Sequence, residues 1–150
     1  MIENLCIQIE FSVTKKINFI SIYRPPGNHP LLSVNQQLES FFYNFEELLL
    51  NIGTSETYIC TDNNNNLLDL NNYNSSKNFF ELLTSQGFLN LITKATGFSP
   101  HNLSLVDQII SNTDKSEFKS GVLIHDLSDH FFTFNGLYLS KKISKPKIFF

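Results

Sequence analysis

The chain has 150 residues, of which 41% are hydrophobic and 17% are charged, a composition that fits one globular domain and excludes a disordered polypeptide. Its formal net charge of −3 excludes a protein that binds nucleic acid mainly through a basic surface, because neutralising phosphates supplies most of that affinity. No apolar run approaches the roughly 20 residues of a membrane span, so a helical membrane protein is excluded as well.

Hydrophobic periodicity predicts a chain in which strands outnumber helices. Apolar residues that alternate with polar ones indicate half-buried strands, and apolar residues three or four positions apart indicate amphipathic helices. In chain order the predicted elements are strands over 5–11 and 17–23, a helix over 33–52, a strand over 56–60, a helix over 76–85, and strands over 88–93, 103–111, 121–125 and 131–139. Both helices have an apolar stripe, so we expect packed sheets with helices outside them.

The first predicted helix has the clearest boundaries. Ser33 and Gln36 fit a capping box, in which the side chain of each residue accepts a hydrogen bond from the backbone N–H of the other. Gly53 stands where a glycine in the left-handed conformation commonly ends a helix.

The cysteine content and the two terminal segments are used to predict the cellular location and the domain boundary. Cys6 and Cys60 are too few for a disulfide framework or a zinc site, and the N-terminus lacks the pattern of a secretory signal. We therefore expect a reduced, intracellular protein of the cytoplasm or nucleus. Four lysines and Pro146 near the other end predict an exit linker over residues 141–150, behind a domain of residues 1–140.

Acidic and polar residues follow or interrupt several predicted strands, and they are candidates for a functional site. They are Tyr23, Asp62, Asn64, Asp107, Asp129 and His130. Carboxylates, an amide and an imidazole that meet at one sheet edge could bind a hard cation such as Mg²⁺ together with a phosphate.

Each of these candidates also has a purely structural interpretation. Asp62 and Asn64 fit a turn, and Tyr23 fits the edge of a core. Asp129 and His130 fit a helix cap or a loop. Asp107 lies inside an apolar strand, where a carboxylate has to be exposed or paired.

Five segments, taken in order, resemble a known superfamily. They are Ile-Ser-Ile-Tyr-Arg-Pro-Pro-Gly over 20–27, Tyr-Ile-Cys-Thr-Asp-Asn-Asn over 58–64, Ser-Leu-Val-Asp-Gln-Ile over 104–109, Ser-Gly-Val-Leu over 120–123 and Leu-Ser-Asp-His over 127–130. This order resembles the endonuclease/exonuclease/phosphatase superfamily, and most of all the endonuclease domain of non-LTR (LINE-type) retrotransposon reverse transcriptases. The resemblance runs from about residue 3 to residue 134.

The resemblance implies an α/β fold, a four-layer α/β/β/α sandwich of the DNase I-like type that lacks its first strands here. It also implies roles for the candidate residues. Asp62 would orient or deprotonate the attacking water, Asn64 and Tyr23 would contact the scissile phosphate, and Asp107 would brace His130 on that phosphate. Asp129 would lie near the metal, and Asp129 with Asp62 are the expected ligands of Mg²⁺ or Mn²⁺.

The sequence departs from the family pattern at several positions. Thr61 stands in place of a glycine, Asn63 in place of a phenylalanine and Gln108 in place of a histidine. Ala95-Thr96-Gly97 stands where Pro-Thr-Arg is expected, so a basic contact is lost. The chain is also expected to begin after the asparagine of the first strand and the metal-binding glutamate of the family.

The function implied by the resemblance is metal-dependent hydrolysis of phosphodiesters, in an N-terminally truncated DNA-nicking endonuclease domain of retroelement origin. DNA would be the substrate, and a reverse transcriptase would be fused to the domain in the parent element. Two alternatives remain open: a catalytically inactive relic of such a domain, and a phosphatase or phosphodiesterase that acts on a small phosphate ester.

Overall fold

The computed structural model describes residues 3–12, 15–25, 32–100, 102–113, 119–137 and 147–149. A six-stranded sheet in the order β10-β1-β2-β3-β7-β4 forms its centre, and β5 with β6 and β8 with β9 form two smaller sheets. In chain order the elements are β1 (Glu3–Ser12), β2 (Lys15–Tyr23), α1 (Val34–Ile52), β3 (Thr57–Asp62), α2 (Asn74–Ser85), β4 (Leu89–Asn90), β5 (Gly97–Ser99), β6 (Asn102–Ser104), β7 (Asp107–Ser111), β8 (Lys119–Leu123), β9 (Phe132–Gly136) and β10 (Lys147–Phe149).

The order of the central strands brings distant parts of the chain to one edge of the sheet. β2 and β3 are parallel, and α1 is the crossover between them. β7 runs antiparallel to β3, so β7 begins beside the point where β2 and β3 end. Arg24 and Asn63, the residues directly after β2 and β3, therefore lie near the residues that open β7.

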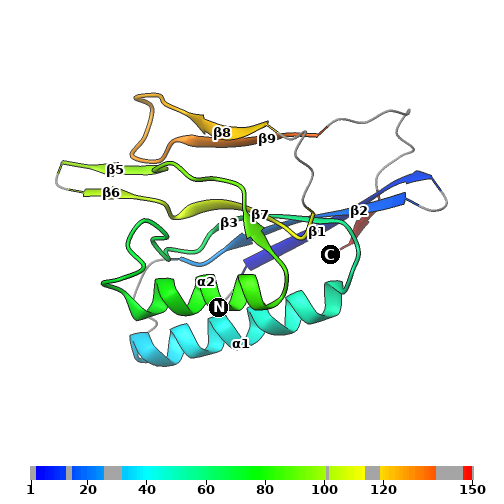
Figure 1. Ribbon diagram of the computed structural model, residues 1–150, viewed down its shortest axis with the longest axis horizontal. Helices are drawn as coiled ribbons and strands as arrows, with labels where there is room; N and C mark the ends of the chain where they lie inside the picture. The colour runs from blue at the N-terminus through cyan, green and yellow to red at the C-terminus, as the bar shows by residue number, and fades with distance from the viewer. Residues whose placement is uncertain are drawn as a thin grey trace.

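The described residues form three layers (Figure 1). Both helices cover one face of the six-stranded sheet, and the two small sheets lie over its other face. The helix-side core contains a cluster of aromatic rings from α1 and α2, with Phe41, Phe45 and Phe79 fully buried against strand residues such as Ile59. A second core, built on Ile92, Leu105 and Ile109, fills the space between the sheets.

The α/β fold class and the first helix agree with the prediction. The Ser33–Gln36 capping box is present, because the Ser33 hydroxyl accepts from the Gln36 N–H and the Gln36 side chain accepts from the Ser33 N–H. Gly53 has the expected positive φ of 60°, but its ψ of −136° lies outside the left-handed helical region. The second helix begins at Asn74, two residues earlier than predicted.

The prediction of one strand over 103–111 was wrong. β6 and β7 are separate strands, because Leu105 and Val106 leave the ladder between them. The Val106 N–H donates to the Thr96 hydroxyl, and the Val106 carbonyl accepts from the Asn63 N–H. β5 lies in the segment predicted to be a loop, and only Leu89 and Asn90 of the strand predicted over 88–93 enter the sheet.

The C-terminal residues bear on the predicted domain boundary. β10 pairs with β1, with Ile7 opposite Ile148, so part of the predicted linker segment contributes a strand to the central sheet. Residues 138–146 lie outside the described residues, and the boundary between domain and linker stays a prediction. Within the described residues, neither helix is long and apolar enough to cross a membrane.

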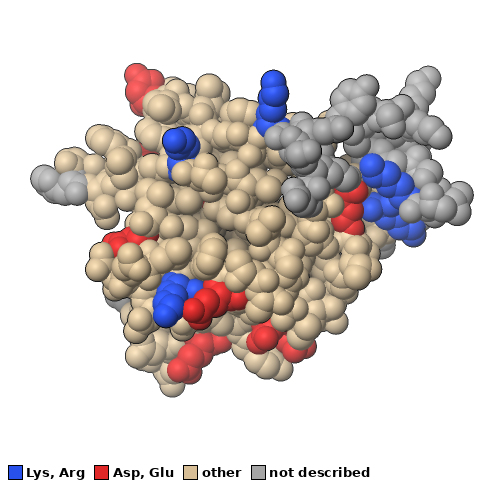
Figure 2. All heavy atoms as spheres, viewed as in Figure 1, with Lys and Arg blue, Asp and Glu red and all other residues tan. Residues whose placement is uncertain are grey.

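Charged side chains are sparse on the face of the molecule shown in Figure 2. The described Lys and Arg residues on this face stand singly or in small groups, with Asp and Glu residues between them. On this face the distribution agrees with the formal net charge of −3.

Candidate active site

Three of the predicted site residues lie next to one another on neighbouring strands. Tyr23, the last residue of β2, pairs with Asp62, the last residue of β3, and Asp62 pairs with Asp107, the first residue of β7. Paired residues on adjacent strands extend from the same face of a sheet. The phenol and the two carboxylates therefore form a row at the sheet edge, on the face turned toward the small sheets.

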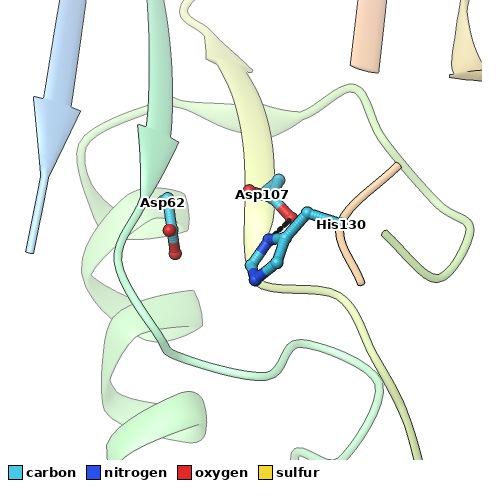
Figure 3. A group of neighbouring side chains, drawn as sticks. All are labelled: Asp62, Asp107 and His130. Atoms are coloured by element: carbon cyan, nitrogen blue, oxygen red, sulfur yellow. Dashed lines mark hydrogen bonds and ion pairs between the residues drawn. The ribbon is translucent and has the colours of Figure 1, made fainter. Parts of the chain in front are cut away.

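His130 reaches this row from the second layer. It forms an isolated bridge with Gly97 of β5, and the neighbouring Phe131 N–H donates to the Thr96 carbonyl at 2.7 Å. Its Nδ1 lies 2.9 Å from Oδ2 of Asp107. A carboxylate only accepts hydrogen bonds, so Nδ1 carries the proton, and in the neutral ring Nε2 has a free lone pair. Figure 3 shows the ring beside both carboxylates.

Asp62, Asp107 and His130 each offer a ligand atom, and these atoms lie within 4.8 Å of one another. Oδ1 of Asp62 is buried and has no hydrogen-bond partner among the described residues. A carboxylate oxygen in that position fits a hard cation, because Mg²⁺ prefers oxygen ligands and retains several waters. The residues present therefore fit part of a Mg²⁺ or Mn²⁺ site.

The surroundings raise the pKa of Asp62. Burial is the largest cause, and the negative charge of Asp107 adds to it. His130, Arg24 and the backbone N–H of Asn64, which donates to the Asp62 carboxylate, act in the opposite direction. Asp62 thus keeps its proton to a higher pH than an ordinary aspartic acid.

The pKa of His130 is also raised. Burial alone would lower it, but the hydrogen bond and the charge of Asp107 outweigh burial, and the charges of Asp62 and Asp129 act in the same direction. The imidazolium is favoured because three carboxylates surround the ring. A positively charged ring beside a sheet edge can bind a phosphoryl oxygen.

Asn64 lies close to the row but is turned toward β2. It has a φ of 57°, in the left-handed region that asparagine tolerates better than most residues. Its side-chain Nδ2 donates to the Arg24 carbonyl at 2.9 Å, and Nε of Arg24 donates back to the Asn63 carbonyl. These two hydrogen bonds hold the loop after β3 against the end of β2. The contact of Asn64 with a phosphate stays a prediction.

The remaining predicted residues are more exposed. Asp129 has an exposed side chain and is not in the group within 4.8 Å, so its role as a metal ligand stays a prediction. Its carbonyl accepts from the Phe98 N–H of β5 at 2.9 Å. Tyr23 is 40% exposed at the end of the row, where its phenol can be reached from solvent.

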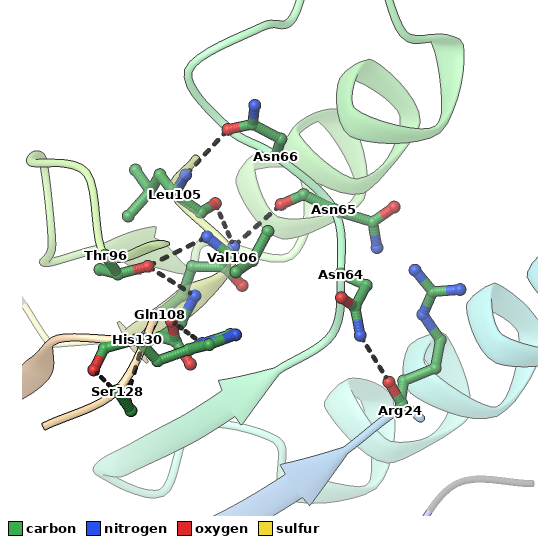
Figure 4. A network of polar contacts seen from close by, with 11 residues as sticks. Arg24, Asn64, Asn65, Asn66, Thr96, Leu105, Val106, Gln108, Ser128 and His130 are labelled. Carbon is green, nitrogen blue, oxygen red and sulfur yellow. Dashed lines mark hydrogen bonds and ion pairs between the residues drawn. The ribbon is translucent and has the colours of Figure 1, made fainter. Parts of the chain in front are cut away.

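Sequence reasoning missed three buried polar residues that support the row. The Thr96 hydroxyl accepts from the backbone N–H groups of Val106 and Asp107 at 3.2 and 3.0 Å. Asn63 and Gln108 form a buried side-chain hydrogen bond of 2.7 Å. Figure 4 shows the Gln108 amide with the Asn65 and Leu105 carbonyls, which accept from its Nε2. Asn63 and Gln108 were named only as departures from the family pattern, and Thr96 only as the middle residue of Ala95-Thr96-Gly97. The signal that could have found Asn63 and Gln108 is that each directly follows a candidate carboxylate, whereas no signal in the sequence singles out Thr96.

Solved structures with a similar fold include three that are useful for comparison. The endonuclease domain of TRAS1, a telomere-specific non-LTR retrotransposon, has a TM-score of 0.66 and 17% identity, over 88% of this chain and 60% of that one. An endonuclease/exonuclease/phosphatase family protein from Leptotrichia buccalis has a TM-score of 0.55 and 18% identity, over 91% and 53%. A beta toxin mutant from Staphylococcus aureus with bound magnesium ions has a TM-score of 0.54 and 11% identity, over 85% and 51%.

These likenesses establish the fold, and the chain spans 60% or less of the length of each of these structures. No curated protein matches the sequence. A family model described as endonuclease-reverse transcriptase matches residues 17–134, which include Tyr23, Asp62, Asp107 and His130. Because that match covers well over half of its residues, the chain belongs to the endonuclease-reverse transcriptase family within the endonuclease/exonuclease/phosphatase superfamily.

Proposed function

We propose that this chain is a metal-dependent phosphodiesterase domain that nicks DNA and derives from a retroelement. The observation that carries the proposal is the 2.9 Å contact between His130 and Asp107, next to a second carboxylate, Asp62, with an unpartnered buried oxygen among the described residues. Such a set can bind a phosphate and activate a water at the same place. The family and the TRAS1 likeness support DNA as the substrate and a reverse transcriptase as the neighbouring domain.

Each residue of the row has a chemical role in this proposal. Asp62, with its raised pKa, orients the attacking water and accepts its proton. The His130 imidazolium contacts a non-bridging phosphoryl oxygen through Nε2, while Asp107 holds the ring through Nδ1. Tyr23 and Asn64 contact the flanking oxygens of the phosphate. Bound Mg²⁺ would neutralise the charge that develops on the phosphoryl group, with Asp62 and Asp129 as its protein ligands.

A small phosphate ester is the second candidate substrate. The observation that favours it is the charge of the protein, because a net charge of −3 and a single arginine, Arg24, supply little attraction for a long polyanion. A small ester needs only the local contacts of the row. The two candidates differ in substrate and share the same chemistry at phosphorus.

The test is nicking of supercoiled plasmid in Mg²⁺, compared with hydrolysis of bis(p-nitrophenyl) phosphate. We expect wild-type protein to nick the plasmid, EDTA to abolish nicking, and His130→Ala to reduce the rate about 10²- to 10⁴-fold. His125→Ala is the matched control, since this second histidine precedes the same loop but packs against Phe132, and it should retain activity. Hydrolysis of the ester without nicking would favour the second candidate. Wild-type activity no higher than that of His130→Ala would refute both and leave an inactive relic.

A further inference from the structure

Two buried amides lie directly behind the two carboxylates of the row. Asn63 follows Asp62 just beyond the end of β3, and Gln108 follows Asp107 within β7. Asp62 and Asp107 are themselves paired. Side chains alternate along a strand, so Gln108 faces the helices while Asp107 faces the small sheets. The core clusters confirm this alternation, since Ile110 packs on the helix side and Ile109 between the sheets. Asn63 is 0% exposed and Gln108 is 1% exposed.

The Gln108 amide joins two segments of the chain through three hydrogen bonds. Its Oε1 accepts from Nδ2 of Asn63 at 2.7 Å. Its Nε2 donates to the Leu105 carbonyl at 2.9 Å and to the Asn65 carbonyl at 3.0 Å. Oδ1 of Asn63 in turn accepts from the Asn65 N–H at 2.9 Å. We call this pair of side chains, Asn63 and Gln108, the amide clamp.

The amide clamp lies where the backbone ladder stops. The last β3–β7 pair is Asp62 with Asp107, and beyond it the chain continues as the loop 63–66 on one side and the turn at Leu105 and Val106 on the other. Strand ends lose their pairing more readily than strand centres. The clamp joins the loop to the turn, and so it holds the two carboxylate-bearing residues at a fixed separation although both are terminal.

Burial of these amides is costly unless their hydrogen bonds are made, and an apolar pair could fill the same space. A buried amide without a partner costs about 1–3 kcal/mol, whereas an apolar pair of the same shape is close to neutral. A buried polar network with fixed geometry specifies orientation in a way that apolar packing does not. In this chain the network lies next to Asp62 and Asp107, the two carboxylates whose orientation the proposed chemistry depends on.

We propose that the amide clamp is a positioning device that fixes the Asp62 and Asp107 carboxylates relative to each other, and through Asp107 the ring of His130. Asn63 and Gln108 touch neither substrate nor metal. They act through the carboxylates that precede them in the chain. The inference rests on the proposed function for its consequence in catalysis, but the geometry it predicts can be measured without any activity.

The test uses Gln108→Met, which keeps the length of the side chain and removes its three hydrogen bonds. The matched control is Ser111→Ala, at the other end of the same β3–β7 pair, where a fully buried hydroxyl donates to the Thr57 carbonyl at 2.9 Å. Both variants should unfold at a lower temperature than wild type. Only Gln108→Met should change the tautomer of His130 and the affinity for Mn²⁺.

Two measurements report on the site itself. The ¹⁵N shifts of His130, recorded at a pH where the ring is neutral, give its tautomer. We expect Nδ1–H in wild type and in Ser111→Ala, and a shift toward the mixture of free histidine in Gln108→Met. Calorimetric titration with Mn²⁺ should show affinity about tenfold lower in Gln108→Met, since residues that orient metal ligands typically contribute 10–100-fold.

The outcomes separate the clamp from the proposed function. If Gln108→Met lowers the unfolding temperature but leaves both the tautomer and the Mn²⁺ affinity at wild-type values, the clamp is only structural and the inference is overturned. If wild type binds no Mn²⁺, the proposed metal chemistry fails, while the tautomer still decides the inference.

A second variant covers the case in which Gln108→Met does not fold. Asn63→Leu with Gln108→Met removes both amides of the clamp, so neither is left without its partner, and the double variant should regain part of the lost stability. Its His130 tautomer should still shift toward that of free histidine. A wild-type tautomer in the folded double variant would overturn the inference.

Discussion

One hydrogen bond between Asp107 and His130 both orients the imidazole ring and raises the pKa of His130. Asp107 fixes which ring nitrogen carries the proton, and its charge favours the protonated ring. Asp62 is paired with Asp107 on the neighbouring strand, and its pKa is raised first by burial and then by the negative charge of Asp107. Removal of one charge should therefore affect both neighbours.

We predict that Asp107→Asn lowers the pKa of both His130 and Asp62. His130 loses a charged acceptor, so its proton is released at lower pH, and Asp62 loses a like charge, so it ionises at lower pH. NMR titration of the metal-free protein measures both values. Asp126→Asn, an exposed carboxylate before the same loop, is the control and should leave both unchanged. An unchanged pKa of His130 in Asp107→Asn would contradict the structure.

The same contact makes the stability of the fold depend on pH. The folded pKa of His130 is raised above its ordinary value of about 6.5, so the ion pair stabilises the fold fully below that value. The contribution disappears as pH rises through the raised folded value. We predict that urea denaturation shows a larger stability difference between wild type and Asp107→Asn near pH 6 than near pH 9. An equal difference at both pH values would mean that Asp107 does not raise the pKa of His130 in the folded protein.

Among the secondary-structure elements, those that periodicity and capping determine could be predicted from the sequence. The first helix has an apolar stripe and a capping box within one segment, so local signals suffice. The break between β6 and β7 could not be predicted, because it depends on Thr96 and Asn63, which are distant in the chain from each other and bind Val106 from two sides. Asp62, Asp107 and His130 could be named from their motifs, but the amide clamp depends on strand register, which the sequence does not show.

The Thr96 hydroxyl should be the main support of the turn before β7. It is the acceptor for two backbone N–H groups, of which one belongs to Asp107. Thr96→Val keeps the shape and leaves both donors without a partner, so we predict a loss of about 2 kcal/mol in the free energy of unfolding. Denaturation in urea measures it. Thr93→Val, at an exposed position three residues earlier, is the control. Equal stability of the two variants would refute this role.

The helix-side core should depend on the aromatic cluster that joins α1 to α2. Phe79 is 0% exposed and lies 5.3 Å from Phe45, centroid to centroid, whereas its neighbour Phe80 is 42% exposed. Phe79→Ala should cost about 3–5 kcal/mol, through lost burial and a cavity. Phe80→Ala should cost clearly less. Thermal and urea denaturation of the two variants compare them within one helix.

For the whole molecule, net charge and the proposed site should have opposite effects on binding of DNA. A protein that neutralises six to ten phosphates loses roughly 10³–10⁵ in affinity between 50 and 200 mM salt. In the proposed site Tyr23, Asn64 and His130 contact phosphate, and of these three His130 alone carries a positive charge. With a net charge of −3, we therefore expect this chain to neutralise few phosphates, about one to three.

We therefore predict a shallow salt dependence. Binding of a labelled DNA duplex, measured by fluorescence anisotropy in EDTA, should weaken by only about 4- to 40-fold between 50 and 200 mM KCl, since each neutralised phosphate contributes a slope of about −0.9. His130→Ala should flatten this dependence further, because it removes a charge that faces the phosphate. A loss of 10³-fold or more in wild type would mean that a basic surface outside the row binds the DNA, and it would move the substrate contact away from this site.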